Sequence, residues 1–251
     1  MRYKITLSYN GAQFFGWQRQ SELPSVQQTL EEALSTLLRC PVTVTGAGRT
    51  DTLVSAAGYV AHFDACNVED CIVLTRKLNA VLPQSVSVLR VEEAAEDFNS
   101  RFDAVQRSYT YFVHRCKDPF VAGYSYQYSY PVLDVEAMNR AASYLIGQHD
   151  FSSFEKTGSD NKTSICTVTR AVWSEYTPVV CAGGSGEYLK FEVSADRFLR
   201  NMVRAIVGTL LEVGRGKRSP ESVADLLNLH DRCSAGESVP GHALFLTEIK
   251  Y

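Results

Sequence analysis

The sequence predicts an α+β fold made of two halves in which antiparallel strands and amphipathic helices are mixed. Three observations predict it. Segments in which polar and apolar residues alternate, as in half-buried strands, recur along the whole chain. Capped segments with apolar residues three and four apart, as in helices with one buried face, lie between them. Finally, 251 residues, 45% of them hydrophobic, can bury a large core as one large domain or two small ones.

The first half, residues 1–104, is expected to hold four strands and two helices. Ser25 and Gln28 match a capping box at the start of the first helix, and the second helix must end before Pro83. The expected strands are residues 2–9, 42–45, 58–64 and 85–91, and the expected helices are residues 25–38 and 69–81.

The second half, residues 105–251, is expected to repeat the mixture after a joint near residues 99–105. Gly147 and Gly214 follow the apolar periodicity of two helices and are expected to end them. The halves are compatible with diverged copies of one architecture. The expected strands are residues 107–114, 165–173, 188–193 and 244–251, and the expected helices are residues 134–146, 196–213 and 219–229.

Composition narrows the class of protein. The seven cysteines form no Cys-x-x-Cys pair and the five histidines show no ligand spacing, so neither a disulfide framework nor a metal site is expected. Free thiols favour a reducing cytoplasm. The chain holds no run of about 18 apolar residues, so no membrane span is expected. Its first nine residues alternate as a strand does, unlike a signal peptide.

The distribution of charge is more informative than its sum. A net charge of −3 is not typical of a general nucleic-acid binder, yet residues 196–218 carry six cations against two acids. This pattern fits a basic face on a mildly acidic body. It fits ordinary solvated charge equally well.

The stretch Gly46–Asp51 (Gly-Ala-Gly-Arg-Thr-Asp) carries the strongest chemical signal. Its glycines allow a sharp turn and a close approach to a ligand. Asp51 on such a turn can act as a nucleophile, and Arg49 can reach a phosphate or enter a base stack. A structural Gly-rich turn is the alternative.

The expected helix 196–213 has one wide apolar stripe with Arg197, Arg200 and Arg204 along its flank. An arginine at the border of a buried face needs a partner, and a carboxylate such as Asp51 would suit it and stay ionised beside it. Arginines whose stems merely cover the edge of a core helix are the alternative.

Two further segments combine aromatic and polar side chains. Alternation places Arg107, Tyr109 and Tyr111 on one face of a strand, where an aromatic ring can stack on a base and the cation can hold a phosphate. Residues 9–20 are dense in aromatic and amide side chains and suit RNA contacts. For both segments, plain packing is the alternative. No phosphate loop, dinucleotide fingerprint, nucleophile elbow or zinc deaminase pattern accompanies them, so nucleotide and metal-dependent hydrolysis lack support.

Taken together, these pieces resemble the tRNA pseudouridine synthase A family nearly from end to end. Six segments resemble landmarks of the family and occur in the family's order. They are the N-terminal aromatic motif (residues 9–20), the Gly48–Asp51 loop, the Arg107–Tyr109 strand, and residues 149–154, 198–208 and 240–246. Six matches in sequence make chance an unsatisfactory explanation.

The resemblance implies a role for each matched residue. Asp51 is the nucleophile or electrostatic catalyst, Arg204 pairs with it, and Tyr109 stacks on the uracil and assists removal of the C5 proton. Arg49 fills the space of the extruded uridine and Leu244 packs against the base. Arg107 and Arg200 are assigned to substrate binding.

The resemblance also implies the larger setting. It predicts two pseudo-symmetric ferredoxin-like halves joined in one antiparallel sheet. It further implies a cytoplasmic homodimer that needs no cofactor and isomerises uridines 38, 39 and 40 in the tRNA anticodon stem-loop.

One departure from the family pattern leaves alternatives open. The family continues Ala-Gly-Val-His-Ala after the aspartate, whereas this chain reads Thr52-Leu53-Val54-Ser55-Ala56. If the glycine position needs a positive φ, Leu53 is strained or the loop is rebuilt, and Ser55 removes a possible RNA contact. A catalytically decayed tRNA-binding or tRNA-folding protein is therefore one alternative, and a nucleoside glycosidase or phosphorylase is another.

Overall fold

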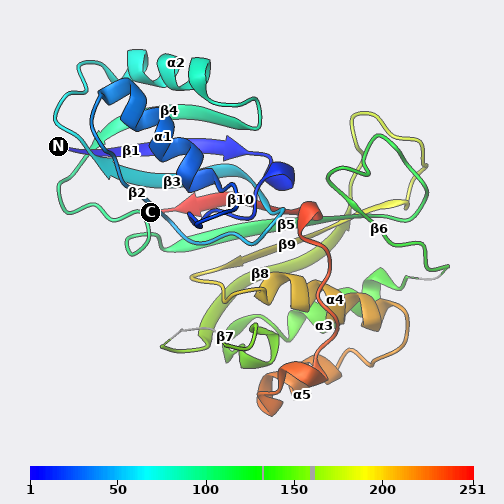
Figure 1. Cartoon of the computed structure of the whole chain (residues 1–251). Coiled ribbons are helices and arrows are strands. Elements are labelled where there is room, and N and C mark those ends of the chain that lie inside the picture. The colour runs from blue at the N-terminus through cyan, green and yellow to red at the C-terminus, as the bar shows by residue number, and fades with distance from the viewer. Residues whose placement is uncertain (132, 159–161) are drawn as a thin grey trace. The chain divides into compact units, whose positions relative to one another are not determined.

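The computed structural model describes residues 1–131, 133–158 and 162–251. It divides the chain into unit 1, Met1–Val105 with Phe245–Tyr251, and unit 2, Gln106–Leu244. Both units mix helices and strands, which confirms the α+β class (Figure 1). The last seven residues thus group with the first part of the chain in space, although they follow the second part in sequence. No helix in the described part of the chain is long and apolar enough to cross a membrane.

The sheet of unit 1 is built around two strands. β1 (Arg2–Tyr9) pairs antiparallel with β3 (Ser55–Asp64) on one side and with β4 (Val86–Ala94) on the other. β2 (Val44–Gly46) pairs antiparallel with β3, and β10 (Leu244–Lys250) pairs with it in parallel. The end of β2 and the start of β3 therefore bring the Gly46–Asp51 stretch to the rim of this sheet.

The alternation of buried and less buried side chains along β1 shows which face of the unit 1 sheet packs in the core. In β1 every second side chain is buried, from Tyr3 to Tyr9. α1 (Val26–Leu38) and α2 (Cys71–Val81) supply the opposing apolar faces. Ser25 caps α1 as predicted, because its Oγ accepts from the Gln28 N–H at 3.3 Å. The reciprocal half of the capping box is absent, since the Gln28 side chain donates to Glu32 instead.

The main sheet of unit 2 is antiparallel. Its order is β5 (Gln106–His114), β9 (Tyr188–Ala195), β8 (Ile165–Glu175) and β7 (Gly147–Asp150). The short strand β6 (Tyr126–Gln127) pairs with β5 in parallel. The sequence did not predict β6 or β7, because both are too short to show a period.

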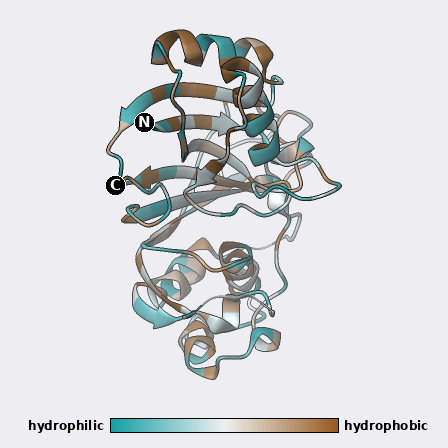
Figure 2. Ribbon diagram, turned by 60° about the vertical axis from the view of Figure 1, so that its left-hand side comes forward, coloured by the Kyte–Doolittle hydropathy of each residue, from teal (hydrophilic) through white to brown (hydrophobic). Residues whose placement is uncertain are grey.

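Three helices pack in unit 2: α3 (Val135–Ser143), α4 (Met202–Gly214) and α5 (Ser222–Leu229). The ribbon of unit 2 carries both hydrophobic and hydrophilic residues on its helices (Figure 2), and α4 is buried over most of its length. α3 is tied to β8 because the Asn139 amide bonds both backbone groups of Trp173, at 2.7 and 3.0 Å. The four described 3-10 turns are η1 (Gly11–Gln13), η2 (Ser152–Phe154), η3 (Arg232–Ser234) and η4 (Gly241–Ala243).

The helix predicted over residues 196–213 is wrong at its start. α4 begins at Met202, after Asn201, whose φ of 66° lies in the left-handed region and cannot continue a helix. Arg197 and Arg200 therefore precede α4, and the predicted row of three arginines along one helix flank does not form. Apolar periodicity overextended the helix because Leu199, although outside it, is also buried.

A buried histidine makes the stability of unit 1 depend on pH. His62 is 6% exposed, and its Nδ1 lies 2.9 Å from the Ser100 hydroxyl and 3.1 Å from the Ser100 backbone N–H. Burial, and next the charge of Arg2, lower the pKa of His62 below its usual value. The unfolded chain therefore takes up a proton near pH 6.5 that the folded chain does not. We expect the free energy of unfolding to fall as pH drops below about 6.5, by at most about 1.4 kcal/mol per pH unit for this proton.

Chemical denaturation of the wild type and His62→Asn between pH 7.5 and 5 measures this effect. The variant should lose part of the slope between pH 6.5 and 5, while His114, whose pKa burial also lowers, retains its own part. Equal slopes in the two proteins would contradict the assignment to His62.

Candidate active site

The loop between β2 and β3 holds the predicted catalytic residues of unit 1. Its backbone leaves β2 through a hydrogen bond from the Ala47 N–H to the Val60 carbonyl, at 3.0 Å. It closes with a turn in which the Val54 N–H donates to the Asp51 carbonyl at 3.1 Å. Arg49 is exposed, Thr50 is buried and Asp51 is half-buried. The carboxylate therefore sits at the edge of the fold on a defined turn.

The N-terminal aromatic motif, residues 9–20, holds this loop through backbone hydrogen bonds. The Trp17 N–H donates to the Thr50 carbonyl and the Leu53 N–H donates to the Phe14 carbonyl, both at 3.2 Å. Trp17 and Phe14 are buried. Of the two interpretations of residues 9–20, packing therefore holds for these aromatic side chains, and the motif serves the site as its support.

Two glycines of that motif are required for the close approach. A Cβ on Gly11 would lie 2.2 Å from the Val54 carbonyl oxygen. A Cβ on Gly16 would lie 2.5 Å from the Thr50 carbonyl oxygen, and its φ of 95° also favours glycine. The backbone of residues 11–16 thus packs directly on the backbone of the Asp51 loop.

Three aromatic rings form the floor of the loop. Trp17 stacks on Tyr59 with ring centroids 4.0 Å apart, and Tyr9 meets Tyr59 edge-on at 5.6 Å. The hydroxyl of Tyr9 lies 2.9 Å from the Thr50 Oγ1, and the hydroxyl of Tyr59 donates to the Gly48 carbonyl. Sequence reasoning missed Tyr59, since a tyrosine in a buried strand carries no signal of its own.

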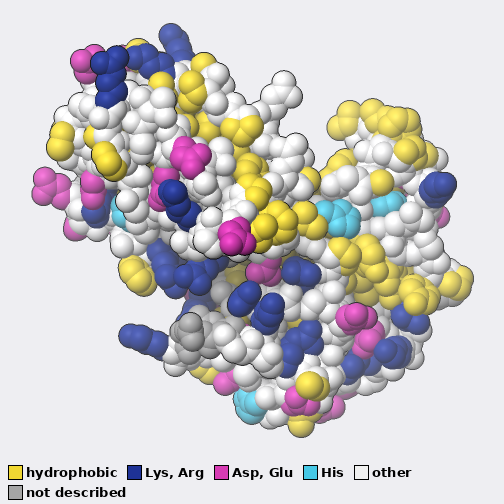
Figure 3. Space-filling view, in the orientation of Figure 1, with side chains coloured by type: hydrophobic (Ala, Val, Ile, Leu, Met, Phe, Trp, Pro, Cys, Tyr) yellow, Lys and Arg dark blue, Asp and Glu magenta, His cyan; other side chains and the backbone are white. Residues whose placement is uncertain are grey.

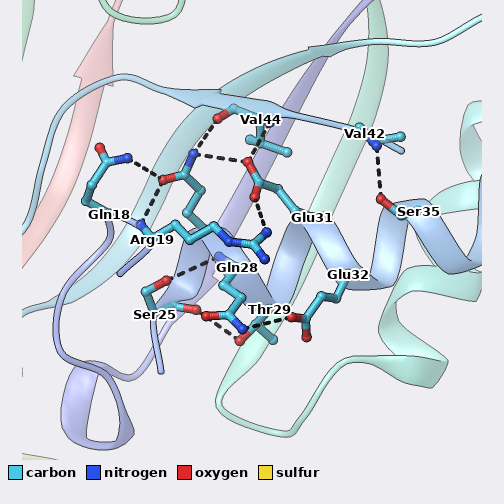
Figure 4. Close-up of polar contacts among 11 residues, drawn as sticks. Gln18, Arg19, Ser25, Gln28, Thr29, Glu31, Glu32, Ser35, Val42 and Val44 are labelled. Atoms are coloured by element: carbon cyan, nitrogen blue, oxygen red, sulfur yellow. Dashed lines mark hydrogen bonds and ion pairs between the residues drawn. The ribbon is translucent and has the colours of Figure 1, made fainter. Parts of the chain in front are cut away.

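A polar network on α1 reaches the start of β2 and the segment that follows Trp17 (Figure 4). Glu31 accepts from the Val44 N–H and from the Arg19 guanidinium, both at 3.0 Å. Gln27 donates to the Val44 carbonyl and accepts from the Arg19 N–H, both at 2.9 Å. Gln27 and Glu31 are buried, and the Gln27 amide donates to Glu31, so these bonds together satisfy both side chains. The network fixes the start of β2 and the segment that follows Trp17.

The departure from the family pattern is accommodated in the loop. Leu53 has a φ of 68°, so its backbone is left-handed, which is the case in which the sequence analysis expected strain at this residue. Ser55 is buried, and its Oγ accepts from the Gly11 N–H at 3.0 Å. The loop therefore keeps its anchors with leucine and serine at these positions, and Ser55 has a structural contact of its own.

Leu53→Gly is expected to be more stable than Leu53→Ala by about 0.5–1 kcal/mol. A left-handed conformation costs an L-residue about 1–2 kcal/mol, which glycine avoids, and the more flexible unfolded chain of the glycine variant offsets part of this difference. The Leu53 side chain is 37% exposed, so both variants lose the burial of the covered part, and the difference between them reports the backbone conformation. Denaturant unfolding of Leu53→Gly and Leu53→Ala measures the effect.

The matched control is Leu89→Gly, because Leu89 is also exposed but lies in the regular strand β4. There the glycine variant should be less stable than Leu89→Ala by roughly 0.5–1 kcal/mol. A Leu53→Gly variant less stable than Leu53→Ala would contradict the strain at this position.

In unit 2, β5 carries the predicted tyrosine. Tyr109 lies opposite Val193 of β9, and its half-buried ring meets Phe198 edge-on at a centroid distance of 5.1 Å. Two residues earlier, on the same face of β5, Arg107 donates from Nη1 to the Asp196 carbonyl at 2.7 Å. Both side chains are thus oriented by the segment that leads into α4.

Arg204 lies in the first turn of α4 and is held by residues 235–240. Its Nε donates to the Val239 carbonyl at 2.7 Å, and the Val239 N–H donates back to the Arg204 carbonyl at 3.3 Å. The segment lies against the helix because Gly208 has no side chain: a Cβ there would meet the Glu237 carbonyl oxygen. Sequence reasoning did not identify this contact between distant glycine-containing segments.

The same segment continues to Leu244. The Tyr111 hydroxyl donates to the Pro240 carbonyl at 2.9 Å, and burial raises the pKa of Tyr111. Leu244, the first residue of β10, is 5% exposed. Within unit 2 the structure therefore links β5, the first turn of α4 and the approach to Leu244.

The predicted site residues thus form two local groups. Arg49 and Asp51 share the loop of unit 1, whereas Tyr109, Arg204 and Leu244 belong to unit 2. Arg200 is exposed ahead of α4 and does not share a helix flank with Arg204. The pairing of Asp51 with Arg204 stays a prediction.

Chemically, unit 1 offers a carboxylate on a well-anchored loop beside an exposed guanidinium. Such a group can attack an electrophilic carbon or stabilise a developing positive charge. Unit 2 offers the phenol ring of Tyr109, which contacts Phe198 edge-on, and the guanidinium of Arg204 in the first turn of α4. Rings of this kind stack on nucleobases.

Comparison with known proteins identifies the family. Residues 141–251 match the family described as tRNA pseudouridine synthase. The protein named tRNA pseudouridine synthase A of Bacteroides thetaiotaomicron is 48% identical over 250 residues, which cover 100% of this chain and 90% of the relative. Those of Parabacteroides distasonis and Bacillus subtilis are 46% and 39% identical, again over 100% of this chain and over 96% and 99% of the relatives. Since each of these matches covers the whole chain at 39–48% identity, the chain belongs to the tRNA pseudouridine synthase A family of isomerases.

Proposed function

We propose that this protein converts uridine to pseudouridine in tRNA, with Asp51 as the nucleophile. The observation that carries the proposal is the Asp51 loop. Its carboxylate is half-buried on a turn whose neighbours are held by backbone hydrogen bonds to Phe14 and Trp17. A fixed carboxylate beside an exposed arginine suits an attack on a base that has left its stack.

The proposed reaction is an isomerisation. The N1–C1′ bond of uridine breaks, the uracil turns, and a C5–C1′ bond forms while the C5 proton leaves and N1 gains one. No net oxidation occurs, so the reaction calls for no redox cofactor. Asp51 attacks C1′ or C6, or stabilises the charged sugar, and shielding from water strengthens each of these effects.

The remaining residues take supporting roles in the proposal. Arg49 fills the space of the extruded uridine and Arg204 pairs with Asp51. Tyr109 stacks on the uracil and assists removal of the C5 proton, and Leu244 packs against the base. The fixed edge-on contact of Tyr109 with Phe198 supports a stacking role, since a preoriented ring loses little freedom on binding.

Contacts to the RNA backbone are proposed for Arg107 and Arg200. Arg200 is exposed, and Lys and Arg side chains gather on the drawn face of unit 2 (Figure 3). Cations grouped in this way attract phosphates even in a chain of net charge −3.

The substrate position and the assembly follow from the family resemblance. We propose uridines 38, 39 and 40 of the anticodon stem-loop as targets, and a cytoplasmic homodimer as the working form. Sedimentation of the pure protein with and without tRNA tests the dimer. A monomer in both conditions would contradict it.

Pseudouridine mapping tests the activity. Purified protein is incubated with unmodified tRNAs that carry uridine at the anticodon stem-loop, without added cofactor, and every uridine is then mapped. New pseudouridine confined to positions 38–40 is expected. Pseudouridine elsewhere in the tRNA would keep the reaction but overturn the target, and none in any tRNA would overturn the reaction.

One alternative is a tRNA-binding protein without activity, which the left-handed Leu53 favours. Tight tRNA binding with no pseudouridine would support it. The hydrogen bonds of the Leu53 and Val54 N–H groups favour the active enzyme. They keep the loop around Asp51 in one conformation, which a protein without catalytic activity does not require. A nucleoside glycosidase would instead release free uracil, which chromatography of the same reaction detects.

A further inference from the structure

We propose that Tyr59 and Tyr9 are positioning residues that clamp the catalytic loop on both sides of Arg49. Their hydroxyls hold Gly48 and Thr50, the two neighbours of Arg49, so that Arg49 and Asp51 keep one orientation while the target base leaves its stack. The inference rests on the proposed function, since it assigns a step of that reaction to the clamp.

Tyr59 holds the near side of the loop. Its hydroxyl donates to the Gly48 carbonyl and lies 3.4 Å from the Gly48 N–H. Both polar backbone groups of one loop residue thus face a single side chain. Tyr59 is fully buried in β3, so this hydroxyl belongs to the sheet and cannot follow the loop if the loop moves.

Tyr9 holds the far side. Its hydroxyl lies 2.9 Å from the Oγ1 of Thr50, and both residues are buried. Tyr9 is the last residue of β1, whose register against β3 shifts between Leu7 and Tyr9. Two neighbouring strands of one sheet therefore each place a phenol hydroxyl under the loop.

The rings that carry these hydroxyls have no room to turn. Tyr59 is stacked on Trp17 at 4.0 Å and meets Tyr9 at 5.6 Å. A Cβ on Gly46 would lie 2.2 Å from the Tyr59 hydroxyl and 2.6 Å from the Trp17 ring. Only a glycine at position 46 lets the hydroxyl reach the loop.

Arg49, between the two held residues, is exposed while Thr50 beside it is buried. Insertion into an RNA stack requires a guanidinium that projects from a rigid backbone. The arginine must replace the stacking of the departing nucleobase, and it can do so only if its own backbone does not move. The clamp therefore acts on base extrusion, a step that follows tRNA binding.

Removing one hydroxyl tests the clamp. Tyr59→Phe keeps the ring stack and should lower kcat by about tenfold, with KM for tRNA changed less than about twofold, since a loosened loop costs orientation and not affinity. Tyr9→Phe should act in the same direction. Tyr3→Phe is the matched control: Tyr3 is buried in β1 like Tyr9, but its hydroxyl contacts the Met1 sulfur instead of the loop.

Two readouts separate positioning from a general loss of structure. A stem-loop in which the target uridine is mismatched pays less for extrusion, so the defect of Tyr59→Phe should shrink on it to about threefold or less. In a double-mutant cycle, Tyr59→Phe should add little once Arg49→Ala has been made, because both changes remove the same function.

The outcomes are distinct. If the wild type forms no pseudouridine, the proposed function fails and takes the clamp with it. If the wild type is active but Tyr59→Phe and Tyr9→Phe both retain its kcat, or lose equal activity on paired and mismatched substrates, the clamp alone is overturned. If Tyr59→Phe fails to fold, Tyr9→Phe, which removes the hydroxyl that meets Thr50, is tested by the same readouts.

Discussion

Asp51→Asn is expected to lower the rate of pseudouridine formation by about 10³-fold or more. Asparagine keeps the size of the side chain but is not a nucleophile, and the loss of a nucleophile removes most of an enzyme's rate advantage. The turn that closes the loop runs through the backbone of Asp51, whose carbonyl accepts from the Val54 N–H, and asparagine keeps this bond. We therefore expect tRNA affinity to change by less than about tenfold. Single-turnover formation of pseudouridine and a filter-binding assay measure the two quantities.

The control for this change is Asp97→Asn. Asp97 is an exposed carboxylate of the same unit, distant from the loop in sequence, and its variant should keep the wild-type rate. An Asp51→Asn protein that retained more than about a tenth of the rate would show that another group is the nucleophile.

Gly11→Ala is expected to lower kcat by about 100-fold. The added Cβ would lie 2.2 Å from the Val54 carbonyl oxygen and 2.7 Å from the Leu53 carbonyl carbon, so the backbone just after Asp51 must move. A displacement of about 1 Å in a catalytic group can cost about 10²-fold in rate. The overpacking should also lower the free energy of unfolding by roughly 1–3 kcal/mol. Steady-state kinetics and denaturant unfolding at a temperature where the variant stays folded check both effects.

Gly123→Ala is the matched substitution without a close neighbour, because a Cβ at Gly123 meets no atom within 4 Å. It should leave kcat and stability near the wild-type values. If Gly11→Ala lost stability but kept kcat, the backbone contact would matter for folding alone, and the link between the aromatic motif and catalysis would be wrong.

The local elements could be predicted where one period dominated. β1, β10 and the cap of α1 at Ser25 lie where the alternation and the capping residue indicated. The start of α4 could not be predicted, because Leu199 continues the apolar stripe although the left-handed Asn201 separates it from the helix. A buried loop residue that precedes the buried face of a helix extends the helical spacing of apolar residues, so the sequence does not show where the helix begins.

For the candidate site, the sequence identified the loop residue by residue but not what holds it. Gly48–Asp51 stood out by composition, and the catalytic role of Asp51 stays a prediction. Tyr59 gave no signal in the sequence. It lies 11 residues after Gly48, and its hydroxyl reaches Gly48 only because β2 pairs with β3. The aromatic motif was noticed, yet only its burial separated support of the loop from contact with RNA.

By itself, the sequence determined the family, the mixture of strands and helices, and the carboxylate and arginine of the loop, because these depend on residue identity and short-range order. Only the tertiary structure decided that Tyr9, Trp17 and Tyr59 form the floor of that loop, that Gly11 and Gly16 admit its backbone, and that residues 235–240 hold Arg204. These contacts join residues far apart along the chain, and whether two such residues meet depends on strand register and close packing, which no local pattern records.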